Sequence, residues 1–210
     1  MSKPSREYYI MVIPELCMGC KSCEIACAVE HSKTKSIYTA PFETPPPIAR
    51  IRILAVENYF VPMRCQHCKD APCMAVCPTG AISRTEEGFV VLNPQKCIGC
   101  LMCATACPFG HPKIDSYTRT VVKCDFCYDR IRKGALPACV EACPTSALRF
   151  GTLDELMEKV AEEKAEAMLK GMGKVPGHVI VFPAERMGEK KEPQMKVSDV
   201  RSMYSNVRWE

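Results

Sequence analysis

The chain has 210 residues and a formal net charge of +4, and 47% of its residues are apolar. Cysteine accounts for 16 of the apolar residues, and only seven Phe, seven Tyr and one Trp could build an aromatic core, so a core this small needs staples such as bound metal. The weak positive charge argues against a nucleic-acid-binding protein, and no run approaches the roughly 20 apolar residues of a membrane helix. Residues 1–7 lack both an apolar signal core and a twin arginine, which predicts a cytoplasmic protein.

The cysteines fall into four groups of four with none left over. The first and third groups have the spacing C-x2-C-x2-C-x3-C, which is typical of bacterial [4Fe–4S] ferredoxins, and the other two widen its middle gap. The groups are Cys17, Cys20, Cys23 and Cys27; Cys65, Cys68, Cys73 and Cys77; Cys97, Cys100, Cys103 and Cys107; and Cys124, Cys127, Cys139 and Cys143. Because each iron of a cubane takes one thiolate, the sequence predicts four [4Fe–4S] clusters that pass single electrons.

An internal repeat organises the first three quarters of the chain. A strand-like run over 8–13 precedes Pro14 and the first cysteine group, and a similar run over 88–92 precedes Pro94 and the third group. Both groups open with Cys-x-Gly-Cys, in which glycine permits the positive φ of a tight turn. The repeat therefore predicts two copies of a strand, a cysteine loop, a short helix and a return strand.

The segments around the second cysteine group add further strands. An insertion of about residues 31–64 contains two predicted strands, over 50–56 and 59–61. Residues 81–83 and 89–92 are expected to form a hairpin, because two strand-like runs flank a short turn.

The last quarter of the chain has a different composition. Thr152 is expected to cap a helix over 153–170, whose apolar residues recur on one face, and residues 178–182 have the length of a strand. The polar tail 184–210 is predicted to be a partner-docking arm, because Trp209 is suited to anchor it.

Two other uses of clustered cysteines remain open at this point. Four-cysteine zinc sites also use paired C-x2-C, although they rarely place a third cysteine three residues after the second. Disulfides would suit an even number of cysteines in a secreted protein, but cysteines at i, i+3 and i+6 are poorly placed to pair with one another. A zinc-dependent interaction module is the distant alternative, and a brown colour in anaerobically purified protein would exclude it.

No acid–base or nucleophilic constellation accompanies the cysteines, and no glycine-rich loop suggests a nucleotide site. His67 and His111 are expected beside the clusters or at the surface rather than as ligands, since thiolates saturate the irons. Met18 and Met102 lie between ligand cysteines and are expected to cover the clusters as apolar side chains. We therefore predict an electron-transfer protein that is not catalytic by itself.

Taken together, the cysteine groups resemble those of the four-cluster electron-transfer subunits of the dimethyl sulfoxide reductase family. The resemblance covers about residues 8–150 and rests on the wider second and fourth groups and on the segments 14–27, 64–68 and 123–127. It implies an α+β fold, in which two pseudo-symmetric bacterial-ferredoxin-like lobes bind four cubane clusters and a C-terminal helix and tail follow. The predicted domains are 1–150 for the four clusters, 151–183 for the helix and strand, and 184–210 for the tail.

The resemblance also implies partners. The short form without an anchor is most similar to the iron–sulfur partner of carbon monoxide dehydrogenase, so a hetero-oligomer with such a catalytic subunit and a second redox partner is favoured. A molybdenum or tungsten pterin enzyme acting on formate or an aldehyde is the alternative catalytic partner.

Finally, the resemblance implies which cysteines share a cluster, because the fourth cysteine of each group reaches the neighbouring cluster of its lobe. Lobe A combines groups 17–27 and 124–143, and lobe B spans 65–107. The expected ligand sets of lobe A are Cys17, Cys20, Cys23 and Cys143, and Cys124, Cys127, Cys139 and Cys27. The expected ligand sets of lobe B are Cys65, Cys68, Cys73 and Cys107, and Cys97, Cys100, Cys103 and Cys77.

The number of clusters can be tested by chemical analysis. Four cubane clusters predict about 16 iron and about 16 acid-labile sulfide per chain, since each cluster holds four of each. Iron and sulfide would be assayed in anaerobically purified protein. Iron near half that amount in protein kept strictly anaerobic would contradict the presence of four clusters.

Overall fold

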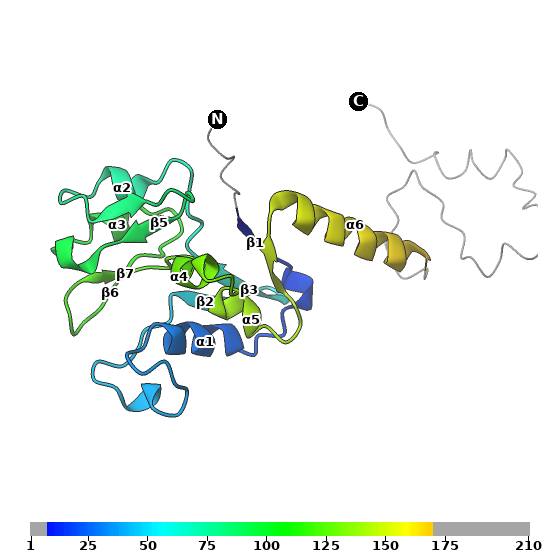
Figure 1. Ribbon diagram of the computed structural model, residues 1–210, viewed down its shortest axis with the longest axis horizontal. Helices are drawn as coiled ribbons and strands as arrows, with labels where there is room; N and C mark the ends of the chain where they lie inside the picture. Colours follow the sequence, from blue (N-terminus) through cyan, green and yellow to red (C-terminus); the bar gives the residue numbers. More distant parts are fainter. Residues whose placement is uncertain (1–7, 170–210) are drawn as a thin grey trace, which may run out of the picture. The chain divides into compact units, whose positions relative to one another are not determined.

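The structure, a computed structural model, describes residues 8–169 of the chain (Figure 1). One unit extends to Met157 and a second begins at Glu158, a boundary that falls inside helix α6 (Leu153–Leu169). The strand expected over 178–182 and the tail with Trp209 lie outside the described residues. None of the helices in the described part is both long and apolar enough to cross a membrane.

The two ends of the first unit come together in one group of elements, for which we keep the name lobe A. Strand β1 (Tyr9–Val12) pairs antiparallel with β8 (Leu148–Gly151), and helix α1 (Ser22–Glu30) contacts α5 (Ala138–Glu141). Their buried side chains form one core together with the first strand of the insertion and the lobe junction. The buried members of this core are Ile10, Cys23, Cys27, Ile51, Phe89, Phe126, Cys139 and Leu148.

The middle of the chain forms a second group, for which we keep the name lobe B. Strand β4 (Ile82–Arg84) pairs antiparallel with β5 (Val90–Leu92), which confirms the predicted hairpin, and helix α2 (Pro72–Ala75) contacts α3 (Met102–Ala106). The buried members of its core are Ala71, Cys73, Ile82, Val90, Cys103 and Val121. Both cores thus contain the clustered cysteines themselves, so apolar packing and the cysteine sites are built from the same residues.

The insertion forms a hairpin of β2 (Ile51–Val56) and β3 (Tyr59–Arg64), which pair residue for residue along their length. The second strand is longer than predicted, because it continues through Pro62. A proline lacks the N–H that a ladder needs, but in a two-stranded ribbon its open side needs no partner strand. The extension matters because it carries Arg64 into the buried region beside Cys65.

Short elements complete the described part of the chain. They are the 3-10 turns η1 (Pro14–Leu16), η2 (Ala40–Phe42) and η3 (Pro94–Lys96), the paired strands β6 (Lys113–Ile114) and β7 (Val121–Val122), and helix α4 (Tyr128–Arg132). Helix α6 begins as predicted with a capping box. The Glu155 N–H donates to Thr152 Oγ1 (3.4 Å), and the Thr152 N–H donates to Glu155 Oε2 (2.9 Å).

All four C-x2-C loops share one backbone turn. The third residue of each loop has positive φ: 71° at Gly19, 48° at His67, 68° at Gly99 and 66° at Phe126. Glycine adopts this conformation without strain, as the sequence predicts for two of the loops, whereas the histidine and the phenylalanine adopt it at a cost of about 1–3 kcal/mol each. The two non-glycine residues sit where the lobes meet, with ring centroids 5.0 Å apart.

Gly99 has a second reason to be glycine, which a substitution can test. A Cβ atom on Gly99 would lie 2.1 Å from the Arg119 carbonyl oxygen, whereas one on Gly134, which also has positive φ, would meet nothing within 4 Å. Gly134→Ala should therefore cost only the left-handed strain of about 1–2 kcal/mol. Gly99→Ala should cost roughly 1–3 kcal/mol more from overpacking. Equal thermal midpoints for the two anaerobic holo-variants would contradict this explanation.

Candidate metal centres

The cysteines of lobe B line two cavities. One cavity is lined by Cys65, Cys68, Cys73 and Cys107, together with His111 and apolar residues. The other is lined by Cys77, Cys97, Cys100 and Cys103. In each cavity, three cysteines come from one group and the fourth comes from the other group of the lobe. The geometry therefore gathers the thiols as crossed ligation requires.

The cysteines of lobe A show the same crossing through their electrostatics. Burial raises the pKa of Cys23 to about 12, and Cys143 and Cys17 are among the neighbouring groups that raise it further. Burial also raises the pKa of Cys139 well above its usual value, and the thiols that add to this shift are Cys124, Cys127 and Cys27. Glu24 also raises the pKa of Cys23, and Arg64 opposes the shift of Cys139, but the thiols that act on each of the two cysteines belong to its expected set.

This donor chemistry fits [4Fe–4S] clusters. Burial raises the pKa of the Cys124 and Cys127 thiols to about 12, so without a bound cation they would remain protonated. Iron binds the thiolate form, so a metal centre must replace those protons. Sets of four soft thiols, gathered from two segments each, supply the four corners that a cubane needs.

The four sets differ in their access to solvent. Cys20 and Cys100 are exposed, whereas Cys65, Cys73, Cys124 and Cys139 are buried. We call the sets that contain Cys20 and Cys100 the outer sets and the other two the inner sets. Met18 and Ile98, which lie in the same C-x2-C loops as the exposed cysteines, are 62% and 66% exposed. Each lobe therefore has one outer set with an exposed cysteine and one inner set whose cysteines are buried or half-buried.

Backbone N–H groups donate to several of the sulfur atoms. The donors are Arg50 to Cys27 (3.2 Å), Phe126 to Cys124 (3.4 Å) and Val121 to Cys97 (3.4 Å). Hydrogen bonds to cluster sulfurs stabilise negative charge and so raise the reduction potential. Two of the three donors act on the inner set of lobe A.

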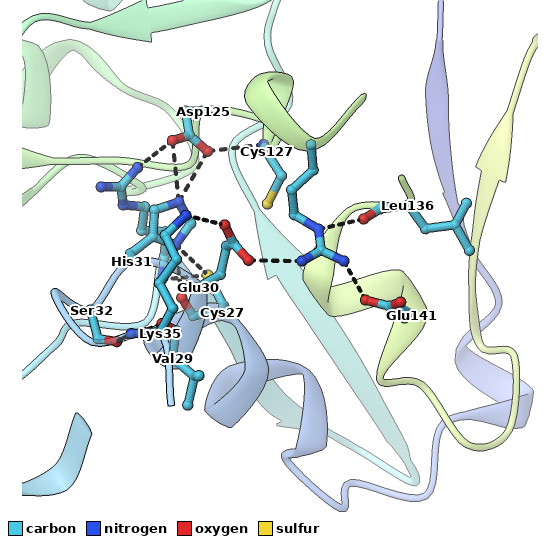
Figure 2. A network of polar contacts seen from close by, with 12 residues as sticks. Cys27, Val29, Glu30, His31, Ser32, Lys35, Asp125, Cys127, Leu136 and Glu141 are labelled. Atoms are coloured by element: carbon cyan, nitrogen blue, oxygen red, sulfur yellow. Dashed lines mark hydrogen bonds and ion pairs between the residues drawn. The ribbon is translucent and has the colours of Figure 1, made fainter. Parts of the chain in front are cut away.

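A half-buried polar network supports that same inner set (Figure 2). Asp125 accepts from His31 Nε2 at 3.2 Å and from the Arg50 guanidinium at 2.6 Å, and it also accepts the Cys127 N–H at 2.9 Å. His31 Nδ1 lies 2.7 Å from the Cys27 carbonyl oxygen. The network thus holds together two ligand segments that lie far apart in sequence.

The charges in this network are fixed by mutual pairing. Burial opposes ionisation of His31, but its hydrogen bonds to Asp125 and Cys27 prevail and raise its pKa to about 9. Burial likewise opposes ionisation of Asp125, but the hydrogen bond and charge of His31 and the charge of Arg50 hold its pKa well below the usual range. His31, Asp125 and Cys127 come close enough to suggest a separate metal site. Because His31 and Asp125 already neutralise each other, we assign them a supporting role.

The sequence missed this network and placed other side chains only roughly. The sequence signal that could have revealed the network is His31, which lies one helical turn after Cys27. His67 is half-buried: its Nδ1 accepts the Val90 N–H (3.0 Å), and the burial of its ring lowers its pKa to about 2. His111 is buried beside the inner cavity of lobe B. Met18 and Met102 are exposed, and their role as apolar cover of the clusters stays a prediction.

Comparisons with known proteins agree with this donor set. Residues 56–153 match the 4Fe-4S dicluster domain family, and residues 14–30 match a 4Fe-4S binding domain. The B subunit of the anaerobic dimethyl sulfoxide reductase of Escherichia coli (strain K12) is 35% identical over 84% of this sequence and 89% of the relative. The thiosulfate reductase electron transfer subunit PhsB of Salmonella typhi is 39% identical over 74% and 81%. An iron-sulfur protein of Rhodospirillum rubrum is 41% identical over 75% and 88%.

Crossed ligation can be tested by combining substitutions. Cys107→Ala should remove about four of the 16 irons, because a cubane that loses a ligand is lost as a unit. Adding Cys68→Ala should remove no further iron, since both thiols line the same cavity. Adding Cys100→Ala instead should remove about four more. If the Cys107 and Cys100 pair lost only as much iron as Cys107→Ala alone, ligation would not be crossed.

Proposed function

This protein belongs to the family of iron–sulfur electron-transfer subunits that includes the B subunit of dimethyl sulfoxide reductase, and we propose from this premise that it relays single electrons between a catalytic subunit and a second redox partner. Like these relatives, it is an electron-transfer subunit and is not catalytic by itself. It binds [4Fe–4S] clusters, each of which accepts and releases one electron when bound. We propose that the sixteen cysteines hold four of them in the crossed sets, within two ferredoxin-like lobes.

The observation that carries the proposal is the graded exposure of the thiol sets. Each lobe has one outer set with an exposed cysteine and one inner set without one, and the aromatic rings of Phe89 and Phe126 stack at 4.5 Å where the lobes meet. A relay needs contact with partners at its ends and protection from water along its length. We propose that electrons enter and leave through the loops at Cys20 and Cys100, and that they cross between lobes through the inner sets.

For the catalytic partner, we propose a separate reductase subunit of the dimethyl sulfoxide reductase kind, which makes it a molybdenum or tungsten pterin enzyme. The names of the relatives support this choice, since they describe dimethyl sulfoxide reductase and thiosulfate reductase components. A carbon monoxide dehydrogenase partner finds no support in these names, and the relative from Rhodospirillum rubrum is described only as an iron-sulfur protein. The complex is proposed to be a hetero-oligomer in the cytoplasm.

The partner would be identified by anaerobic co-purification from the native host. We expect a catalytic subunit whose metal analysis shows molybdenum or tungsten. Nickel, which would indicate a carbon monoxide dehydrogenase, would contradict our choice of partner but not the relay. A protein that co-purifies with no oxidoreductase and that exchanges no electrons with one would contradict the relay itself.

The two ends of the relay can be tested with matched surface substitutions. Met18→Glu and Ile98→Glu each place a charge beside an outer set, so each should slow electron exchange with one of the two partners about tenfold by weakening docking. Tyr38→Glu is the control, because Tyr38 is 84% exposed but belongs to the insertion rather than to a cysteine loop. Stopped-flow reduction of the complex would report the rates. Equal slowing by all three variants would argue against entry and exit at the outer sets.

A further inference from the structure

Two buried cations occupy the junction between the lobes without a carboxylate partner. Lys123 is 3% exposed and Arg64 is 6% exposed. Neither forms a salt bridge with any acidic residue in the described part of the chain, where the six ion pairs involve other groups. Buried charges are costly unless they are paired, so this position calls for a source of negative charge.

The hydrogen bonds of the two cations are reciprocal. Arg64 donates to the carbonyl of Cys65, the next residue, at 2.8 Å, and to the carbonyl of Ile10 in β1 of lobe A at 2.9 Å. Lys123 donates to the carbonyl of Cys124, the next residue, at 2.7 Å, and to that of Val90 in β5 of lobe B at 2.5 Å. Each cation therefore comes directly before a cysteine group of one lobe and donates a hydrogen bond to a strand of the other lobe.

These contacts join equivalent positions of the internal repeat. Ile10 lies four residues before Pro14, and Val90 lies four residues before Pro94. Cys65 and Cys124 each open one of the two wider cysteine groups, and each belongs to an inner set. The residues before the other two groups, Leu16 and Lys96, are exposed instead. Among the four cysteine groups, a buried cation thus precedes only the two that begin with a cysteine of an inner set.

We propose that Arg64 and Lys123 form a reciprocal cation pair that supplies the counter-charge for the two inner clusters and thereby sets their reduction potentials for electron transfer between the lobes. A thiolate-ligated cubane is anionic, and it gains one further negative charge on reduction. A fixed cation in a buried site favours the more negative state more strongly than an exposed one would. The pair therefore raises the potentials of the inner clusters relative to those of a junction without it.

The test is a redox titration of the isolated anaerobic holo-protein, followed by EPR and visible absorption. Lys123→Met removes the charge at similar length. It should lower the ratio of reduced to oxidised form at a fixed potential by about tenfold in two of the four one-electron transitions, which corresponds to about 59 mV each. Lys123→Arg, which keeps the charge, should retain the parent potentials. Arg64→Met should reproduce the shift from the other side of the junction.

Lys96→Met is the matched control, because Lys96 also immediately precedes a cysteine group but is exposed. This variant should change the ratio of reduced to oxidised form at a fixed potential less than twofold. Unchanged potentials in iron-loaded Lys123→Met and Arg64→Met, or an equal shift in Lys96→Met, would overturn the proposal. If Lys123→Met takes up no iron, full iron loading of Lys123→Arg would show that the site needs the positive charge. Loss of iron in both variants would overturn the proposal. This inference rests on the relay proposed above, but the titration uses no partner, so unchanged potentials would leave the relay standing.

Discussion

Bonds between thiolates and iron are the constraint on which the rest of this structure depends. The two apolar cores are small, and each contains ligand cysteines among its buried members, namely Cys23, Cys27 and Cys139 in lobe A and Cys73 and Cys103 in lobe B. In a core of this size, metal binding free energy becomes folding free energy. With the ligand sets crossed as proposed, each cluster would tie together two segments of the polypeptide, so folding and cofactor insertion are expected to be one event.

This constraint explains why strained backbone is tolerated. His67 and Phe126 hold positive φ at positions where the outer loops use glycine. The same two residues carry the rings that meet at the junction, and the Arg64 guanidinium lies 5.0 Å from the centroid of the Phe126 ring. Glycine would relieve the strain but would leave the junction without its aromatic contacts. In the outer loops, a Cβ atom on Gly19 would clash with the Phe60 ring and one on Gly99 with the Arg119 carbonyl oxygen, so glycine is required there.

Features with a local signature could be predicted from the sequence. The cysteine groups, the hairpin of β4 and β5, and helix α6 with its cap at Thr152 depend on residues close together in the sequence, whose spacing reveals them. The supporting network could not be predicted in this way. His31 and Asp125 are 94 residues apart, and no periodic pattern connects them. The buried positions of Arg64 and Lys123 were likewise hidden, because a cation beside a cysteine is equally consistent with a solvated group, as Lys96 is.

The inner sets of the two lobes differ in the hydrogen bonds that their sulfur atoms receive. In lobe A, the inner set receives N–H donors from Arg50 and Phe126 to its sulfur atoms. In the described residues of lobe B, the backbone N–H donor to a sulfur is that of Val121, and it reaches Cys97 of the outer set rather than the inner set. Hydrogen bonds and cations both favour the reduced state. With the cations shared across the junction, these additional hydrogen bonds favour reduction of the inner set of lobe A.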